Sequence, residues 1–389
     1  MQNLKTNLKV ITINLLILFI FILLPPSLFS IFSPFLYSSR IKESHKNKVI
    51  AFQNENLSYE NPDLEAIKGI KKRYSKKLAK KLKRNNELSF KSFIGWRHAK
   101  VSIVGTNVEG ELQTRISNNQ KLQNSTWFFG GSTMWGQGVD DDGTIPSQYA
   151  LKSGEYVFNF GESGWNTRQS LNQLLNLLGE KHKPKAIIFY DGVNDISAGC
   201  RAEITQLAAY SEETLLRKKL KEVPFSEINN SFISWIIKPY KKISNKLKFN
   251  INKKPLIKNN TCYGNPKKAE KVARHLINNW HAAYLLSRAN SIEFYAILQP
   301  SSYTTSSYVG HVLTNKIYLQ HKENNLAVYP LILKMMKEEC DYSEDFCSRL
   351  VDGTKWSNEE KILFFDFAHL TKKGNEIIAK NIMSLLKNR

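Results

Sequence analysis

The chain has 389 residues and a formal net charge of +22, from 56 Lys and Arg against 34 Asp and Glu. Its 42% hydrophobic and 11% aromatic residues exclude a disordered polycation, because such a chain can bury enough apolar surface to offset its conformational entropy. The length permits two or three domains, or one large α/β domain with appendages. The basic excess suggests a polyanionic partner only if the charge lies on the folded part, so its position matters.

The first forty residues predict a membrane segment. No charged residue lies between Lys9 and Arg40, and residues 10–24 read VITINLLILFIFILL before two prolines. A spanning helix needs about 20 apolar residues, and residues 27–37 supply the extra length if the prolines kink the helix. A cleaved signal peptide is the alternative. Because no Ala-x-Ala-like site follows the run, we expect an uncleaved, single-pass N-terminal anchor over residues 1–40.

Two features bear on the side of the membrane that the rest of the chain occupies. The basic residues before position 10 are outnumbered by those at 40–48, and this count taken literally favours a cytoplasmic domain. The even number of cysteines is compatible with two disulfides in an oxidising compartment, although unpaired cytosolic thiols fit equally; the pairs are Cys200 with Cys262 and Cys340 with Cys347. We expect the periplasmic or extracytoplasmic side.

A basic stretch follows the predicted anchor. Residues 68–84 (KGIKKRYSKKLAKKLKR) hold ten basic residues and no acid, with apolar residues spaced four apart. This spacing predicts a basic amphipathic helix that lies on anionic headgroups, or equally a solvated helix. Nearly half of the net charge therefore belongs to a juxtamembrane stalk at 41–92. A nucleic-acid partner is not expected, because no reader motif accompanies the charge.

From residue 93 to 389 the pattern is that of a globular α/β domain. Short apolar, aromatic-rich runs predict buried strands, at 125–132, 156–163, 185–192 and 292–300. Helical patterns lie between and after them, at 167–180, 267–289 and 371–387. Strands that alternate with helices predict a three-layer α/β/α fold with a mainly parallel sheet. A Lys- and Asn-rich stretch at 201–265 interrupts the alternation, and we interpret it as an insertion.

Polar loop residues follow the predicted strands, at the edge where open parallel sheets bind ligands. They are Gly130-Gly131-Ser132-Thr133, Gly161-Glu162-Ser163-Gly164, Asp191-Gly192-Val193-Asn194-Asp195 and, near the carboxyl terminus, Asp366-Phe367-Ala368-His369. A serine flanked by glycine at a strand-to-helix turn exposes its hydroxyl as a nucleophile. A histidine can take its proton, and an aspartate three residues earlier can hold the other ring nitrogen. Taken singly, each motif is more often a turn or a helix cap.

Together, these four blocks resemble the SGNH (GDSL-like) hydrolase superfamily over roughly residues 124–388. The resemblance implies a flavodoxin-like fold, no metal and no cofactor. It also implies roles for five residues: Ser132 as nucleophile and backbone oxyanion donor, Gly161 as second backbone donor, Asn194 as side-chain donor, His369 as base and Asp366 as its orienting acid. The first block departs from the family pattern, since Gly131 stands where Gly-Asp-Ser has aspartate, and this puts the geometry of the turn in question.

Other residues near the blocks have two interpretations each. Trp135 and Trp165 form either a stacking wall for a substrate or ordinary packing. Arg168 and Asp140 to Asp142 either hold substrate or are solvated, and Gln299 either faces the pocket or ends its strand. A bond between Cys200 and Cys262 would fix the start of the insertion beside the site.

The sequence therefore predicts a membrane-anchored serine esterase or deacylase that acts on an O-acyl ester of a glycan or lipid. An O-acyltransferase acting on an envelope polysaccharide through the same triad is the nearest alternative, because the two differ in how well the site excludes water. A non-catalytic anchored binding or assembly protein with the same fold is the alternative from another class.

Overall fold

The computed structural model of the chain describes residues 88–91, 93–98, 101–103, 106–109, 114–115, 123–202, 204, 260–306, 309, 316–358 and 363–387. The predicted anchor (1–40), the basic stretch (68–84) and most of the predicted insertion (201–265) lie outside these residues. Within the described ranges, no helix is long and apolar enough to cross a membrane.

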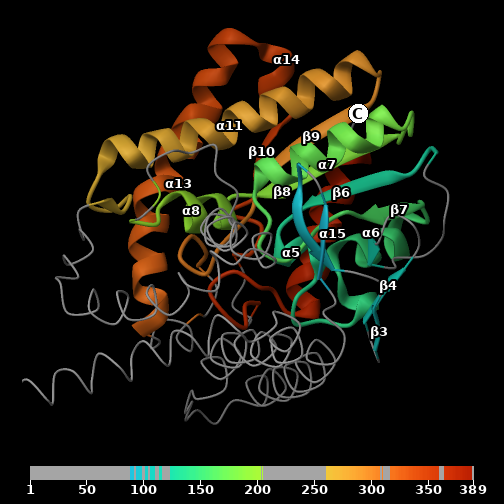
Figure 1. Ribbon diagram of the computed structural model, residues 1–389, viewed down its shortest axis with the longest axis horizontal. Coiled ribbons are helices and arrows are strands. Elements are labelled where there is room, and N and C mark those ends of the chain that lie inside the picture. The colour runs from blue at the N-terminus through green and yellow to red at the C-terminus, as the bar shows by residue number, and fades with distance from the viewer. Residues whose placement is uncertain are drawn as a thin grey trace, which may run out of the picture. The chain divides into compact units, whose positions relative to one another are not determined.

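An eight-stranded sheet, counted over the described residues, forms the centre of the fold (Figure 1), in the order β10-β9-β8-β6-β7-β5-β4-β3. Its parallel strands are β6 (Thr126–Gly130), β7 (Val157–Asn159), β8 (Ala186–Asp191), β9 (Glu293–Leu298) and β10 (Leu350–Asp352). Numbered along the chain, these strands lie in the order 2-1-3-4-5 of flavodoxin-like sheets. The predicted parallel-sheet α/β fold is confirmed.

Strands that the sequence analysis did not predict precede β6. The sheet continues beyond β7 with antiparallel strands, namely β5 (Thr114–Arg115), β4 (Thr106–Glu109) and β3 (Val101–Ile103). A separate antiparallel hairpin joins β1 (Leu88–Lys91) to β2 (Gly95–His98). The predicted boundary between residues 92 and 93 falls in the turn of this hairpin. The folded part thus includes residues on both sides of that boundary.

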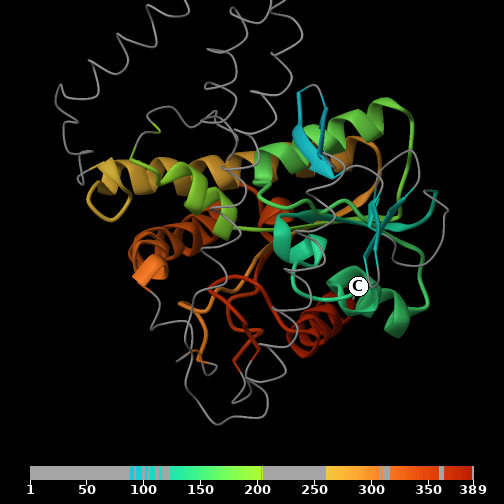
Figure 2. The same ribbon diagram turned by 60° about the horizontal axis from the view of Figure 1, so that its bottom comes forward.

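Helices cover both faces of the sheet. In Figure 2, α7 and α11 lie on one side of the strands, and α6 and α15 lie on the other. The longer helices are α6 (Ile145–Ser153), α7 (Thr167–Gly179), α11 (Pro266–Ala289), α13 (Lys316–Tyr342) and α15 (Lys372–Lys387). The shorter ones are α5 (Ser132–Trp135), η1 (Asp141–Gly143), α8 (Val193–Gly199) and α14 (Glu344–Cys347).

The alternation of side chains along each strand explains the two layers. On β6, Trp127 and Phe129 join the core that packs under α7 and α11, whereas Phe128 joins the core under α6 and α15. The strands β8 and β9 divide their side chains in the same way. Because both faces of a parallel strand are covered, such strands appear in sequence as continuous apolar runs. These apolar runs are the reason that the four strands could be predicted from the sequence.

The helix starts follow local capping chemistry. Asn166 and Gln169 form a capping box at the start of α7. The side chain of Asn265 accepts a hydrogen bond from the N–H of Lys268 at the start of α11, and Thr371 accepts one from Gly374 at 3.2 Å at the start of α15. The loops that end at Asn166 and Thr371 carry two of the polar blocks, so these two caps help to place the site.

Two disulfides join the cysteine pairs that the sequence suggested. Cys200–Cys262 links the end of α8 to the segment before α11, and Cys340–Cys347 links the end of α13 to α14. The first bond thus holds the two ends of the predicted insertion together, directly after the helix that carries Asn194.

Candidate active site

Ser132 lies at the point where β6 ends and α5 begins. Its Oγ is 2.7 Å from Nε2 of His369, a residue 237 positions later in the chain. As the first residue of a helix, Ser132 also has a backbone N–H without an acceptor inside that helix. Both residues are largely buried, with 9% and 8% of their surface exposed, so the hydroxyl and the imidazole meet in an environment with little water.

Asp366 holds the other side of the His369 ring. Its Oδ2 lies 2.6 Å from Nδ1 of His369, and its Oδ1 accepts the backbone N–H groups of Ala368 at 2.9 Å and His369 at 2.8 Å. Burial alone would raise the pKa of this carboxyl, but the charge of His369 and these hydrogen bonds lower it below its ordinary value. Asp366 is therefore kept ionised, and the ring keeps its proton on Nδ1.

Asn194 lies in the first turn of α8, after β8. Its Nδ2 donates a hydrogen bond to the backbone carbonyl of Trp165 at 2.7 Å. The same nitrogen lies against Gly131: a Cβ on that glycine would come 2.0 Å from Nδ2 of Asn194 and 2.9 Å from the Trp165 oxygen. The glycine that departs from the family pattern therefore makes room for Asn194 beside Ser132.

Gly161 also lies against the turn that carries Ser132, and its N–H has a partner within the protein. A Cβ there would lie 2.5 Å from the backbone nitrogen of Trp135, so only glycine allows this approach. Its N–H donates to Oδ1 of Asn159 at 3.0 Å, and the Asn159 amide donates to the carbonyl of Met134 at 3.1 Å. In this conformation, Gly161 packs against α5 and its N–H donates to Asn159.

The sheet topology explains how the blocks meet. β6 and β8 are neighbours and carry Ser132 and Asn194 just beyond their carboxyl ends. The chain leaves β6 for β7 on one side and later enters β8 on the other, which is the switch point where α/β sheets bind ligands. The segment with Asp366 and His369, just before α15, completes the group.

The tryptophans next to the blocks are packing residues. Trp135 is 2% exposed and Trp165 is fully buried, so the interpretation as a substrate-stacking wall is wrong. Gln299 is also buried, and its amide lies 3.4 Å from Oγ1 of Thr133, beneath the nucleophile turn. Of the acidic run, Asp141 pairs with Arg115 and Asp142 with Lys372. Exposed Arg168 contacts Asn279 at 3.4 Å.

Two buried carboxyl groups lie under Asn194. Asp191 ends β8 and accepts a hydrogen bond from Nε1 of Trp280 at 3.3 Å, while Asp195 accepts from the N–H and hydroxyl of Thr167. Burial raises the pKa of Asp195 to about 6. Burial, and then the charge of Asp195, raises the pKa of Asp191 well above its ordinary value. The protonated form of Asp191 is therefore favoured in the folded state.

A group of buried polar residues around Trp135 and Trp165 has no clear sequence signal. They are Arg97, His98, Arg115 and Glu162. The first three precede every predicted block and belong to no motif. Glu162 lies inside the Gly161–Gly164 block, and a charged residue in this apolar, glycine-rich stretch was the one sign in the sequence that a buried polar group lies here.

Comparison with known proteins identifies a family. A family model described as GDSL-like Lipase/Acylhydrolase matches residues 127–382. No match is found among curated proteins. Solved structures with similar chains include a GDSL-like lipase from Bacteroides thetaiotaomicron VPI-5482, which is 11% identical over 70% of this chain and 93% of that chain, with a TM-score of 0.36.

Two acetyl xylan esterases are also similar. One, from the rumen bacterium Butyrivibrio proteoclasticus, is 12% identical over 68% of this chain and 63% of its own, with a TM-score of 0.35. The other, named AlAXEase, is 14% identical over 67% of this chain and 98% of its own, with a TM-score of 0.33. These values are low, so the family assignment rests on the family model.

Proposed function

Because the chain belongs to the family of GDSL-like lipases and acylhydrolases and is a serine hydrolase of ester bonds, we propose that Ser132, His369 and Asp366 are its catalytic triad. The observation that carries the proposal is the pair of contacts on the His369 ring. Nε2 lies 2.7 Å from the serine hydroxyl and Nδ1 lies 2.6 Å from the carboxylate. This arrangement gives the serine a base and fixes the tautomer of that base.

The reaction then follows from the geometry. Nε2 of His369 takes the proton of Ser132 as Oγ attacks the ester carbonyl, and Asp366 stabilises the imidazolium that forms. The imidazolium returns the proton to the leaving alcohol, which leaves an acyl group on Ser132. Water, activated by the same histidine, attacks this ester and releases the acid.

The tetrahedral intermediate needs donors for its oxyanion. The backbone N–H of Ser132 and the side-chain amide of Asn194 are the candidates that this structure supports, since Asn194 reaches the turn through the space left by Gly131. Removing one such donor typically costs about 10²- to 10³-fold in rate. In this proposal, Gly161 allows α5 to pack closely against its backbone.

The substrate class follows from the proposed location. The uncharged apolar segment before Arg40 supports a membrane anchor, and the two disulfides support an oxidising compartment. An enzyme held there meets acylated polysaccharides, glycans and lipids of the envelope. We therefore assign an O-acyl ester of a glycan or lipid as the substrate, and the stretch at 68–84 to anionic headgroups.

The triad is tested with a fluorophosphonate probe and with p-nitrophenyl acetate. The wild-type chain should be labelled and should hydrolyse the ester, whereas Ser132→Ala should show no labelling and a loss of about 10⁴-fold or more in kcat. Ser163→Ala is the matched control, because this serine lies in the neighbouring Gly161–Gly164 loop and its Oγ donates to Gln137 at 3.1 Å. Labelling that persists in Ser132→Ala would assign the nucleophile elsewhere.

The same assay separates the two other functions. If a glycan acceptor gives acyl transfer faster than hydrolysis, the enzyme is an acyltransferase with this triad. If neither the wild type nor Ser132→Ala is labelled, the chain is a non-catalytic binding protein, despite the contact between Ser132 and His369.

A further inference from the structure

The segment just before the family-matched region supplies buried side chains to the catalytic loops. Arg97 and His98 lie on β2, and Arg115 lies on β5. All three lie before residue 127, where the match to the family model begins. Each is buried, with 1–6% of its surface exposed. Buried charged side chains are rare unless they are paired, so their partners indicate what they stabilise.

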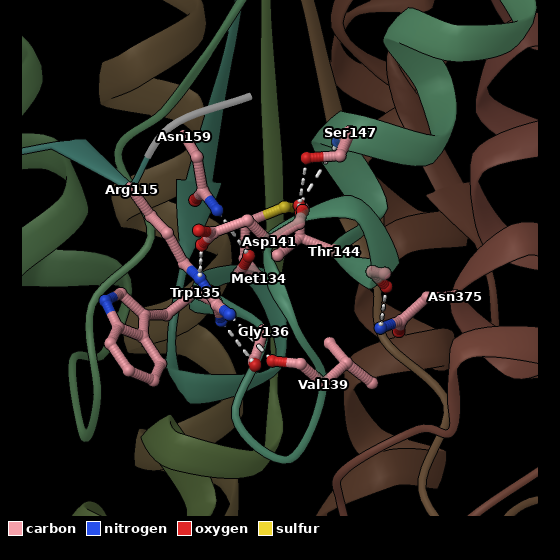
Figure 3. Close-up of polar contacts among 11 residues, drawn as sticks. Arg115, Met134, Trp135, Gly136, Val139, Asp141, Thr144, Ser147, Asn159 and Asn375 are labelled. Atoms are coloured by element: carbon pink, nitrogen blue, oxygen red, sulfur yellow. Dashed lines mark hydrogen bonds and ion pairs between the residues drawn. The ribbon is translucent and has the colours of Figure 1, made fainter. Parts of the chain in front are cut away.

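Arg115 holds the turn that follows the nucleophile helix (Figure 3). Its Nη1 donates to the carbonyls of Trp135 at 2.9 Å and Gly136 at 2.6 Å, and its Nη2 donates to Val139 at 2.7 Å. Its Nε donates to Oδ1 of Asp141 at 2.7 Å. One guanidinium thus satisfies three backbone carbonyls. No other side chain offers the same planar fork of donors.

His98 holds the Gly161–Gly164 loop through Glu162. Its backbone N–H donates to Oε2 of Glu162 at 2.9 Å, and its Nδ1 contacts Oε1 of the same carboxylate. Glu162 also accepts the N–H of Ser163 at 2.7 Å. Burial alone would raise the pKa of Glu162, but His98 and Arg97 lower it below its ordinary value. The loop is therefore fixed around an ionised carboxylate.

Arg97, His98 and Arg115 also pack against two tryptophans that follow the polar blocks in the sequence, Trp135 and Trp165. The ring of Trp135, three residues after Ser132, lies 4.7 Å from the His98 ring and 4.8 Å from the Arg115 guanidinium. The Arg97 guanidinium lies 5.7 Å over the ring of Trp165, whose carbonyl accepts from Asn194. A chain of direct contacts therefore runs from the N-terminal segment to the nucleophile and to the amide donor.

We propose that Arg97, His98 and Arg115 are positioning residues for the serine hydrolase reaction. They hold Trp135, Trp165 and the Gly161–Gly164 loop, so that Ser132 and Asn194 stay in productive geometry. The inference rests on the proposed function and extends the catalytic unit to residues outside the family-matched region. A misplacement of about 1 Å costs on the order of 10²-fold in rate, so contacts of this kind affect catalysis strongly.

The test compares Arg115→Lys with Arg349→Lys in the full chain. Lysine keeps the charge but not the fork, so Arg115→Lys should lower kcat on p-nitrophenyl acetate by about 10- to 100-fold, with a smaller change in KM. Fluorophosphonate labelling should slow by the same factor. Arg349 is the matched control, because it pairs with Glu293 and lies 5.4 Å over Tyr295 at the amino-terminal end of β9, opposite the site. Its variant should keep the wild-type kcat.

A second pair of variants distinguishes a loss of positioning from a loss of folding. His98→Asn keeps a donor near the position of Nδ1, whereas His98→Ala removes it. We expect His98→Asn to recover part of the kcat that His98→Ala loses, at a temperature where thermal unfolding shows all variants folded. Recovery of kcat by a donor, at unchanged foldedness, is not expected of a merely structural residue.

The outcomes are distinguishable. If Arg115→Lys and His98→Ala keep the wild-type kcat while their melting temperatures fall, these residues serve stability only and the inference is wrong. If the wild type itself neither hydrolyses the ester nor reacts with the probe, the proposed function fails and the inference fails with it. A labelled wild type whose variants are slowed at unchanged foldedness supports both.

Discussion

Gly131 is the residue at which the chain departs from its family pattern, and it leaves no room for a side chain. Its φ of −83° is ordinary, so glycine is not required there by the backbone. What requires glycine is space, because a Cβ would lie 2.0 Å from the amide nitrogen of Asn194. The absence of the aspartate and the position of Asn194 are therefore one feature: the amide occupies the volume that a side chain would fill.

Gly131→Ala should therefore displace Asn194 and remove one oxyanion donor. We expect kcat for p-nitrophenyl acetate to fall by about 10²- to 10³-fold, with a smaller change in KM, because this contact matters most in the transition state. Gly179→Ala is the control, since a Cβ at the end of α7 would meet no described atom within 4 Å. Equal activity of the two variants would mean that Asn194 does not need this space.

The triad residues could be predicted because each lies in a short motif with its own chemistry. Ser132 follows two glycines, and Asp366 is three residues before His369. The buried partners could not be predicted in this way. His98 is 64 residues from Glu162 and Arg115 is 20 residues from Trp135, so only the folded sheet brings them together. The hydrogen-bond partner of the Gly161 N–H could not be predicted either, because a local motif does not reveal which acceptor a backbone N–H binds.

At the scale of elements, the buried pair Asp191 and Asp195 joins strands to helices under the site. Asp191 ends β8 and contacts Trp280 of α11, and Asp195 of α8 binds Thr167 at the start of α7. Both pKa values are raised, chiefly by burial. A carboxyl whose pKa is raised by folding stabilises the fold at low pH, and this stabilisation is lost as the pH rises through the folded-state value.

Asp191→Asn should therefore change stability in a pH-dependent way. Asparagine imitates the protonated acid, so the free energy of unfolding should come closest to the wild type near pH 3, where aspartate is protonated in both the folded and the unfolded state. At pH 9, where aspartate is ionised in the unfolded chain and its ionisation is disfavoured in the native state, the variant should be more stable by on the order of 1–3 kcal/mol. Urea unfolding at both pH values measures this. The exposed Asp142→Asn serves as control, and a difference that is the same at both pH values would contradict the assignment.

The elements themselves divide into those with a sequence signal and those without one. β6, β8 and β9 are five or six residues long and almost entirely buried, and the apolar run inside each of them is plain in the sequence. β3, β4 and β5 have two to four residues each, too few for a periodic pattern. α13 contains Pro330 within its 27 residues, and proline ordinarily argues against a helix interior.

At the scale of the whole molecule, the charge and the chemistry lie in different parts of the chain. Ten of the 22 net positive charges fall at 68–84, before the described fold, whereas the proposed triad lies between 132 and 369. In the proposed function, the basic excess therefore bears on attachment to the membrane and not on which bond is cleaved. The two disulfides and the basic residues at 40–48 make opposite predictions about the side of the membrane on which the domain lies.

We expect the folded domain to lie outside the cytoplasm. A phosphatase reporter that requires an oxidising compartment, fused after Arg389, should be active in the full-length chain and inactive when residues 1–40 are deleted, because the apolar segment directs export. The four cysteines should resist alkylation in unreduced cells and react after reduction, since all four are paired in the structure. A silent reporter together with four alkylated cysteines would place the domain in the cytoplasm. The disulfides and the envelope substrate would then both be wrong, whereas the contacts among Ser132, His369 and Asp366 would still support an esterase.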